Sequence, residues 1–136
     1  MIKEIKSGED ILAIVCHKDT ALKKGHNFLT QPKENLQVGI INEEKGHSLK
    51  PHIHNPVERK ILGTQEMLYV EKGRLKVIFF SDSGEKICEE ILNPGDLVAL
   101  LKGGHGFEFL DDAKIIYSKQ GPYNDKETDK KLFGIN

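Results

Sequence analysis

The sequence predicts an all-β protein, folded as a β-sandwich or a small barrel. Short apolar runs follow one another along the chain, and turn signals such as Asn93-Pro94-Gly95-Asp96 separate them roughly every eight to twelve residues. Long amphipathic helices between the runs would indicate β–α–β units, and the sequence has none. Antiparallel strands joined by short turns are therefore the expected architecture.

Each apolar run is interpreted as one strand. The expected strands are 11–15, 36–41, 66–70, 75–80, 87–92, 97–101, 107–110 and 113–117. Phenylalanines of these runs are expected in the core, namely Phe79, Phe80, Phe107 and Phe109. The last segment, 124–136, is polar and lysine-rich up to Leu132-Phe133. We expect a short C-terminal tail there, either frayed or forming a short helix that docks those two residues.

Size and charge narrow the class of protein. A chain of 136 residues fits one compact domain, and we expect residues 1–136 to form it. Twenty Lys and Arg against 21 Asp and Glu give a formal net charge of −1, which argues against a strongly basic nucleic-acid-binding surface. No apolar run approaches the length of a membrane span, and the N-terminus lacks a signal-peptide apolar region. We expect a cytoplasmic protein with no nucleic-acid or membrane partner.

Three of the six histidines stand where they could share a metal ion. On a strand, residues two apart point to the same face, so His52 and His54 would project together. Glu66 opens the next strand on its inward face, and His105 shares a face with Phe107. Imidazole and carboxylate are common ligands of transition metals.

The spacing of these residues resembles the first motif of the cupin superfamily. That motif has a glycine, five residues, His-x-His, a gap, a glutamate, six residues and a glycine. The matching residues here are Gly46, His52, His54, Glu66 and Gly73.

The second cupin motif is also similar to a stretch of this chain. It has a glycine, five residues, Pro-x-Gly, two residues and a histidine. Gly95, Gly103 and His105 follow this order, with Leu101 in place of the proline and one residue, not two, before the histidine. The shorter turn puts the reach of His105 in question, while its shared face with Phe107 favours an inward direction.

A further departure lies between the motifs. Eleven residues separate His54 from Glu66, where the family has three or four, so this insert must loop out or extend a hairpin. Glu58 stands at the usual short distance from His54 and competes for the carboxylate role. We favour Glu66 because it lies on a strand whose alternation faces inward.

The resemblance implies a double-stranded β-helix, that is, a jelly-roll-like barrel. It further implies a divalent transition metal held by His52, His54, Glu66 and His105. The ligand set suits Zn, Fe, Mn, Ni or Cu, and the sequence does not choose among them. Open positions on such a metal would allow Lewis-acid chemistry or activation of water or dioxygen. The candidate bases Glu66, His47 and Tyr123 are not decisive, so no catalytic residue is assigned.

Several polar residues flank the expected site and are candidates for binding a small-molecule ligand. They are Arg59, Lys60, Gln65, Lys119, Gln120 and Tyr123. Runs such as 64–69, 103–107 and 119–123 are similar to small stand-alone cupins of bacterial surface-polysaccharide and sugar-nucleotide biosynthesis. That similarity implies a carbohydrate-related or carboxylate ligand and a place in carbohydrate metabolism, without fixing a reaction.

Three functions remain open at this stage. The first is a metal-dependent isomerase, epimerase or oxygenase. The second is a module that binds a sugar or a small acid without converting it, and the third is a metal-free nucleotide-sugar isomerase with a histidine as base. In a simpler alternative, His52 and His54 are exposed polar positions on an edge strand. We also expect a homodimer, because pairing strand edges with a second copy is a common way to cover them.

Overall fold

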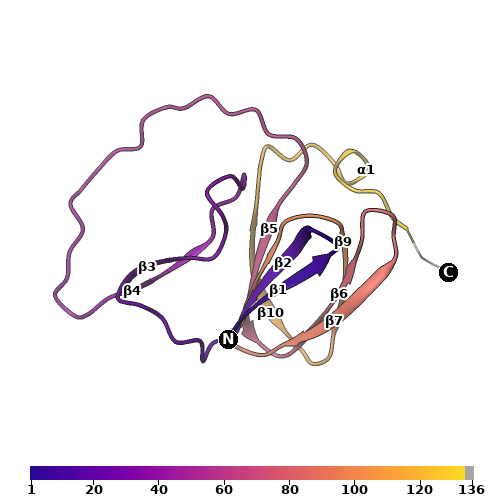
Figure 1. Cartoon of the computed structure of the whole chain (residues 1–136), viewed down its shortest axis with the longest axis horizontal. Coiled ribbons are helices and arrows are strands. Elements are labelled where there is room, and N and C mark those ends of the chain that lie inside the picture. The colour runs from indigo at the N-terminus through magenta and orange to yellow at the C-terminus, as the bar shows by residue number, and fades with distance from the viewer. Residues whose placement is uncertain (134–136) are drawn as a thin grey trace.

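The fold is all-β, as predicted. Figure 1 shows the computed structural model, which describes residues 1–133. Within these residues, helix is confined to α1 (Lys126–Asp129). The strands are β1 (Ile2–Ser7), β2 (Asp10–Cys16), β3 (Gly25–Phe28), β4 (Gly39–Asn42), β5 (Glu66–Lys72), β6 (Leu75–Phe80), β7 (Lys86–Leu92), β8 (Leu97–Leu100), β9 (Gly104–Phe109) and β10 (Lys114–Lys119).

Two antiparallel sheets enclose the main core. The five-stranded sheet has the order β1-β2-β8-β5-β10, and the three-stranded sheet has the order β7-β6-β9. Alternate residues of β6, among them Val77 and Phe79, are buried, because one face of the strand points at the other sheet. Val15, Val70 and Val98 meet them from the five-stranded sheet. The two sheets therefore form a sandwich.

A second core lies on the opposite face of the five-stranded sheet. Ile14 of β2 and Ala99 of β8 point outward there and pack with Leu29 and Val38, which belong to the region of the β3–β4 hairpin. The five-stranded sheet is thus covered on both faces over β2 and β8. The hairpin projects sideways from the sandwich, and the long segment that follows it arcs away from the body before it returns to β5 (Figure 1).

Two glycines allow the turns that connect the sheets. Gly73, between β5 and β6, has φ +77°, and a Cβ there would lie 2.4 Å from the carbonyl oxygen of Asp112. Gly103, just before β9, has φ +72°, and its Cβ would lie 2.3 Å from the carbonyl oxygen of Phe80. Any side chain at either position would meet both a strained backbone and a clash with a neighbouring main chain.

Most predicted strands are confirmed, with shifts at their ends. The runs 11–15, 66–70, 75–80, 87–92, 97–101 and 113–117 correspond to β2, β5, β6, β7, β8 and β10. The run 36–41 overlaps β4 only in part, and β9 begins at Gly104, earlier than the predicted 107, so that it includes His105. Within the described residues no sheet closes into a barrel.

Other predictions need correction. The sequence did not indicate β1 or β3, and residues 43–65 contain no strand, so His52 and His54 do not share a strand face in this structure. The eleven-residue insert does loop out, as expected. Phe107 and Phe109 are 37% and 61% exposed, so they are not core residues. Their rings stand at an opening between the sheets, where no further strand covers them among residues 1–133.

The C-terminal tail docks by one of its two apolar residues. The ring of Phe133 lies 5.0 Å from that of Phe80, edge to face, whereas Leu132 is exposed. Residues 134–136 of the predicted tail lie outside the described residues. Nothing helical in residues 1–133 has the length and apolar character needed to cross a membrane.

The main core predicts a large effect for Phe79. Its side chain is 1% exposed, so Phe79→Ala should leave a cavity and lower the free energy of unfolding by about 3–5 kcal/mol in urea denaturation. Phe28→Ala is the matched control, because that ring is 75% exposed, and it should change stability by less than about 0.5 kcal/mol. Equal losses in the two variants would contradict the placement of the core.

Candidate functional site

Glu66 and His105 meet at the opening between the two sheets. Glu66 is the first residue of β5 and His105 the second of β9, and His105 Nε2 lies 3.5 Å from Glu66 Oε2. One fifth of the Glu66 side chain and one third of the His105 side chain are exposed. The ring of His105 lies 5.1 Å from that of Phe107, the residue two positions further along β9.

The positions of this pair follow from strand pairing. β5 lies between β8 and β10, with Glu66 opposite Leu100 and Lys119. β9 pairs with β6, and His105 stands opposite the buried Phe79. Residues directly opposite each other on antiparallel strands point to the same face, so His105 is directed to the inside of the sandwich. The shortened Gly103–His105 spacing therefore does not turn the imidazole outward.

A pocket of about 440 Å³ opens beside the pair. Its walls are largely apolar and come from β5, β6, β9 and β10. The lining residues are Glu66, Leu68, Leu75, Phe107, Phe109, Ala113, Ile115, Tyr117, Lys119 and Lys130. Tyr117 and Lys130 were not predicted from the sequence as site residues. Tyr117 could have been found from the alternation of Ile115, Tyr117 and Lys119 on one face of β10. Lys130 lies in the C-terminal tail, outside any strand, so no alternation of side chains could have predicted its position.

Burial brings the pKa values of Glu66 and His105 closer together. Burial raises the pKa of Glu66, and the nearby Lys119 and Lys130 oppose that effect in part. Burial lowers the pKa of His105, and the positive charge of Lys130 lowers it further. The two pKa values therefore lie closer together than those of free glutamate and histidine, which eases transfer of a proton between the groups.

Lys119 is held at the rim of the site. Its ammonium forms an ion pair with Asp129 at 3.0 Å and lies 5.0 Å from the centre of the Tyr123 ring. The hydrogen bond and charge of Asp129 raise the pKa of Lys119, so the lysine stays charged at neutral pH. Of the predicted ligand-binding residues, Lys119 thus lines the pocket, and Tyr123 contacts Lys119 without lining the pocket itself.

Gln65 and Gln120 have structural contacts. The Gln65 backbone N–H donates to Gln120 Oε1 at 2.6 Å, and the Gln65 side chain accepts from the backbone N–H of Leu36 and donates to Glu34. These bonds fasten the end of the long loop, just before β5, to the residue that follows β10 and to the segment 34–36. Gln120 Nε2, however, is buried without a hydrogen-bond partner among the described residues, so it retains a donor that a bound molecule or water can use.

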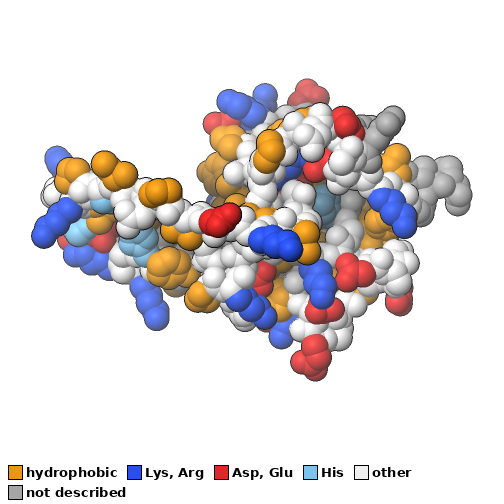
Figure 2. All heavy atoms as spheres, turned by 90° about the horizontal axis from the view of Figure 1, so that it is seen from above, with side chains coloured by type: hydrophobic (Ala, Val, Ile, Leu, Met, Phe, Trp, Pro, Cys, Tyr) orange, Lys and Arg blue, Asp and Glu red, His pale blue; other side chains and the backbone are white. Residues whose placement is uncertain are grey.

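His52 and His54 lie on the extended segment and not beside Glu66 and His105. Their rings are 5.2 Å apart, and His52 Nδ1 lies 3.0 Å from the carbonyl oxygen of Lys50. Arg59 and Lys60 are exposed on the same segment. In Figure 2 histidine side chains are seen both on the projecting part of the molecule and in a hollow of the body.

The predicted four-ligand metal site is therefore divided into two pairs. Within residues 1–133 no group of three or more His, Cys, Asp and Glu side chains is arranged to hold a metal ion. One imidazole and one carboxylate stand at the pocket, and two imidazoles stand on the loop. As arranged in one chain, these donors do not fit the closed or three-ligand sets that metal sites need. Metal binding stays a prediction.

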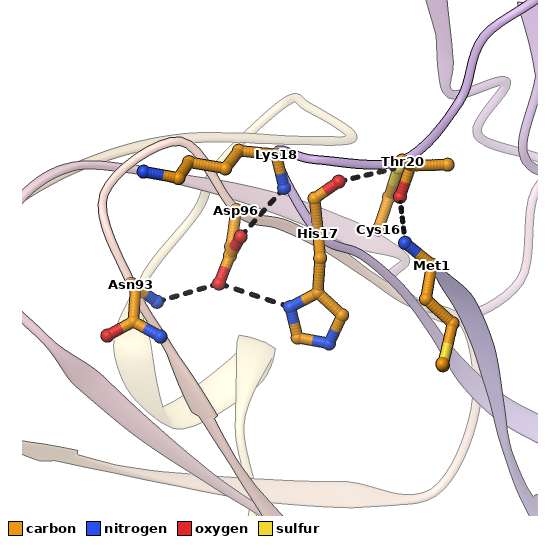
Figure 3. Close-up of polar contacts among 7 residues, drawn as sticks. All are labelled: Met1, Cys16, His17, Lys18, Thr20, Asn93 and Asp96. Atoms are coloured by element: carbon orange, nitrogen blue, oxygen red, sulfur yellow. Dashed lines mark hydrogen bonds and ion pairs between the residues drawn. The ribbon is translucent and has the colours of Figure 1, made fainter.

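A second polar cluster surrounds Asp96, beyond what the sequence indicated. Asp96 is 2% exposed, and its Oδ1 accepts a hydrogen bond from the backbone N–H of Lys18 (Figure 3). Its Oδ2 accepts one from the backbone N–H of Asn93 and lies 3.2 Å from His17 Nδ1. Burial alone would raise the pKa of Asp96. The hydrogen bonds from Asn93, Lys18 and His17 outweigh burial and hold that pKa below its usual value. This cluster joins the turn after β2 to the turn before β8.

Comparison with known proteins adds no relative. No family model matches the chain, and neither a curated protein nor a solved structure matches it.

The Asp96 cluster predicts a pH-dependent contribution to stability. Asp96→Asn removes the charge that three donors stabilise, and at pH 7 it should lower the free energy of unfolding by about 1–3 kcal/mol. A carboxyl whose pKa is lowered by folding stabilises the protein above its unfolded-state pKa and loses that effect as pH falls through the folded-state pKa. The difference from wild type should therefore shrink as the pH of the denaturation is lowered.

The control for this experiment is Asp111→Asn. Asp111 forms an exposed ion pair with Arg74, and a pair of this kind contributes at most about 1 kcal/mol. A loss in Asp96→Asn no larger than in this control, or one independent of pH, would argue against the cluster as a stabilising element.

Proposed function

We propose that the pocket beside Glu66 and His105 binds a small carbohydrate-related or carboxylate ligand, and that these two residues exchange a proton with it. The observation that carries the proposal is the close pair of a carboxylate and an imidazole with converging pKa values at the edge of an apolar pocket. Of the functions considered, this favours an isomerase or epimerase with histidine as base. A module that binds the same ligand without converting it is the alternative.

The pocket walls support the ligand class. Phe107, Phe109 and Tyr117 offer flat apolar surfaces suited to the face of a sugar ring, and Lys119 and Lys130 offer positive charge to a carboxylate or phosphate. The unpaired Gln120 donor lies on the same strand end as Lys119. A ligand with a ring and an anionic group would satisfy both parts of the pocket.

The proposed chemistry is proton transfer at a carbon next to a carbonyl group. His105 is the better base at neutral pH, since its lowered pKa keeps the imidazole neutral. Nε2 takes the proton, the two electrons of the C–H bond move into an enolate, and the charge on the enolate oxygen is stabilised by a lysine ammonium. Return of the proton to the neighbouring carbon gives an isomer, and return to the other face of the same carbon gives an epimer. Glu66 Oε2, 3.5 Å from Nε2, stabilises the positive charge that the imidazole carries while it holds the proton.

We also propose that the two facing sheets are the halves of a jelly roll of the cupin type. The chain repeatedly switches sheets, from β5 to β6 and β7, back to β8, over to β9 and back to β10. This alternation is typical of a double-stranded β-helix. The metal implied by that family enters no step of the proposed chemistry, because the two donor pairs stay apart in one chain.

Proton exchange with solvent tests the function. The protein is incubated in D₂O with fructose 6-phosphate, a thymidine-diphosphate 4-keto sugar and pyruvate, and deuterium uptake next to each carbonyl is followed by NMR. Uptake in at least one substrate is expected, and His105→Gln should reduce its rate by about 10²–10⁴-fold. His26→Gln, which changes a histidine of β3, should leave the rate unchanged.

Ligand binding without exchange is distinguished in the same samples. A rise in the melting temperature with no deuterium uptake supports the binding module and rules out the proton-transfer step. Neither a rise nor uptake with any of these ligands would overturn the proposed function.

The electrostatics of the site make a separate prediction. Lys130→Gln removes a positive charge that lowers the pKa of His105, so that pKa should rise. It is measured from the imidazole Cε1–H shift against pH. Lys131→Gln, at the neighbouring position, is the control and should shift the titration less. If the two variants titrate alike, Lys130 does not influence the pKa of His105, and the prediction is wrong.

A further inference from the structure

The segment 121–133, here named the strap, connects the two sheets at the end of the sandwich that holds Glu66 and His105. It begins after β10, which ends the five-stranded sheet. Its last described residue, Phe133, packs on Phe80 at the end of β6, in the three-stranded sheet. Figure 1 shows the strap running over the top of the sandwich, through α1, toward the turn between β6 and β7. The strap therefore crosses the opening between the sheets.

The near end of the strap is held by Asp129. Its carboxylate forms an ion pair with Lys119 at 3.0 Å, and the two side chains are 21% and 17% exposed. Lys119 lines the pocket and stands opposite Glu66 in the pairing of β10 with β5. Lys130, the next residue of the strap, lines the same pocket, and its charge influences the pKa values of Glu66 and His105. The strap thus brings a charged side chain to the site.

The far end of the strap is a latch formed by Phe133. Its ring lies edge to face against Phe80, with 5.0 Å between the ring centres, and it also lies against Gly104 and Gly84. A Cβ at Gly104 would overlap this ring, since it would lie 2.6 Å from Cε1 of Phe133. The ring therefore fills the space that the missing side chain of Gly104 leaves open, directly before His105 in the chain.

The latch is held less firmly than the near end of the strap. Residues 130–133 belong to neither a helix nor a strand, and Phe133 is 38% exposed although its ring packs on Phe80. One edge-to-face pair of rings contributes little to the stability of a whole domain, so this contact can open while both sheets stay folded. The less exposed ion pair of Asp129 keeps the near end in place.

We propose that the strap is a gate over the Glu66–His105 pocket, which opens at the Phe133 latch and turns about Asp129. Opening moves Lys130 away from the pocket and uncovers the carboxylate and the imidazole. Closing keeps solvent away from a bound ligand, as lids of enzymes do during proton transfer. The role in ligand entry rests on the binding function proposed above, whereas the opening and closing of the strap do not.

Acylation of His105 by diethyl pyrocarbonate tests the gate without any ligand. The reagent modifies a neutral imidazole that it can reach, so the rate at His105 reports how often the strap is open. The reaction is run at mildly alkaline pH, where the imidazole is neutral, and is followed by mass spectrometry of the peptides. His26, which is exposed on β3, is the reference in the same molecule.

Gly104→Ala is the variant that opens the latch. Its methyl group takes the place of the Phe133 ring, while Cβ of Phe80 lies 3.5 Å away, at an ordinary contact distance. The rate at His105 should rise about two- to tenfold, the range expected when one aromatic contact is lost. Gly106→Ala is the matched control on the other side of His105, because its Cβ would lie 3.8 Å from Cε2 of Phe80. It should leave the rate unchanged.

Removal of the ring gives an independent check. Phe133→Ala should raise the rate at His105 by the same factor as Gly104→Ala. The double variant should react no faster than either single variant, because both changes break the same contact. Leu132→Ala, which truncates the exposed neighbour of Phe133, should leave the rate unchanged.

Other outcomes overturn the gate. Rates in Gly104→Ala and Phe133→Ala equal to that of the wild type mean that the strap does not control access. Additive increases in the double variant mean that the two residues act separately. A faster reaction accompanied by faster amide hydrogen exchange throughout β2 and β8 means general unfolding.

The deuterium experiment separates this inference from the proposed function. Deuterium uptake in the wild type, together with strap variants that are acylated no faster than the wild type, supports the function and overturns the gate. Faster acylation in the strap variants, with neither uptake nor binding in the wild type, supports the opening of the strap and overturns the function.

Discussion

The structure depends on the burial of β2 and β8 on both faces. Val15 and Val98 face the three-stranded sheet, whereas Ile14 and Ala99 face the region of the β3–β4 hairpin. Because neighbouring strand residues alternate between faces, an apolar run without interruption is the only pattern that satisfies both cores. These two strands hold the sandwich and the hairpin together. They also fix β5 beside β8, which sets the position of Glu66.

Strands with such runs could be predicted from the sequence, and strands with polar alternation could not. β2 and β8 read as apolar segments, while β1 has one buried residue, Ile5, between charged neighbours. β3 is a short polar strand whose partner is β4. In both, hydrogen bonding to an adjacent strand decides the conformation, and tertiary pairing of this kind leaves little mark on local sequence.

Two of the four residues predicted to form the site lie together, and the other two lie apart from them. Alternation on β5 and β9 placed Glu66 and His105 inward, and these two residues do meet. The same reasoning failed for His52 and His54, because residue spacing implies a shared face only if the segment is a strand, and a strand requires a neighbour to pair with. The motif therefore describes which residues could come together. Gln65 and Gln120 were singled out for their position, and their contacts turn out to secure the loop before β5.

The pairing of β2 with β8 has a consequence for synthesis of the chain. Cys16 of β2 pairs with Leu97 of β8, so the two central strands of the sheet lie far apart in the sequence. While the ribosome is still adding residues before β8, β2 has only β1 as a partner, and its apolar side chains have no core to enter. Long-range pairing of this kind slows folding. The apolar side chains of β2 that face β8 and the cores on either side therefore stay uncovered until residues 97–100 have been added.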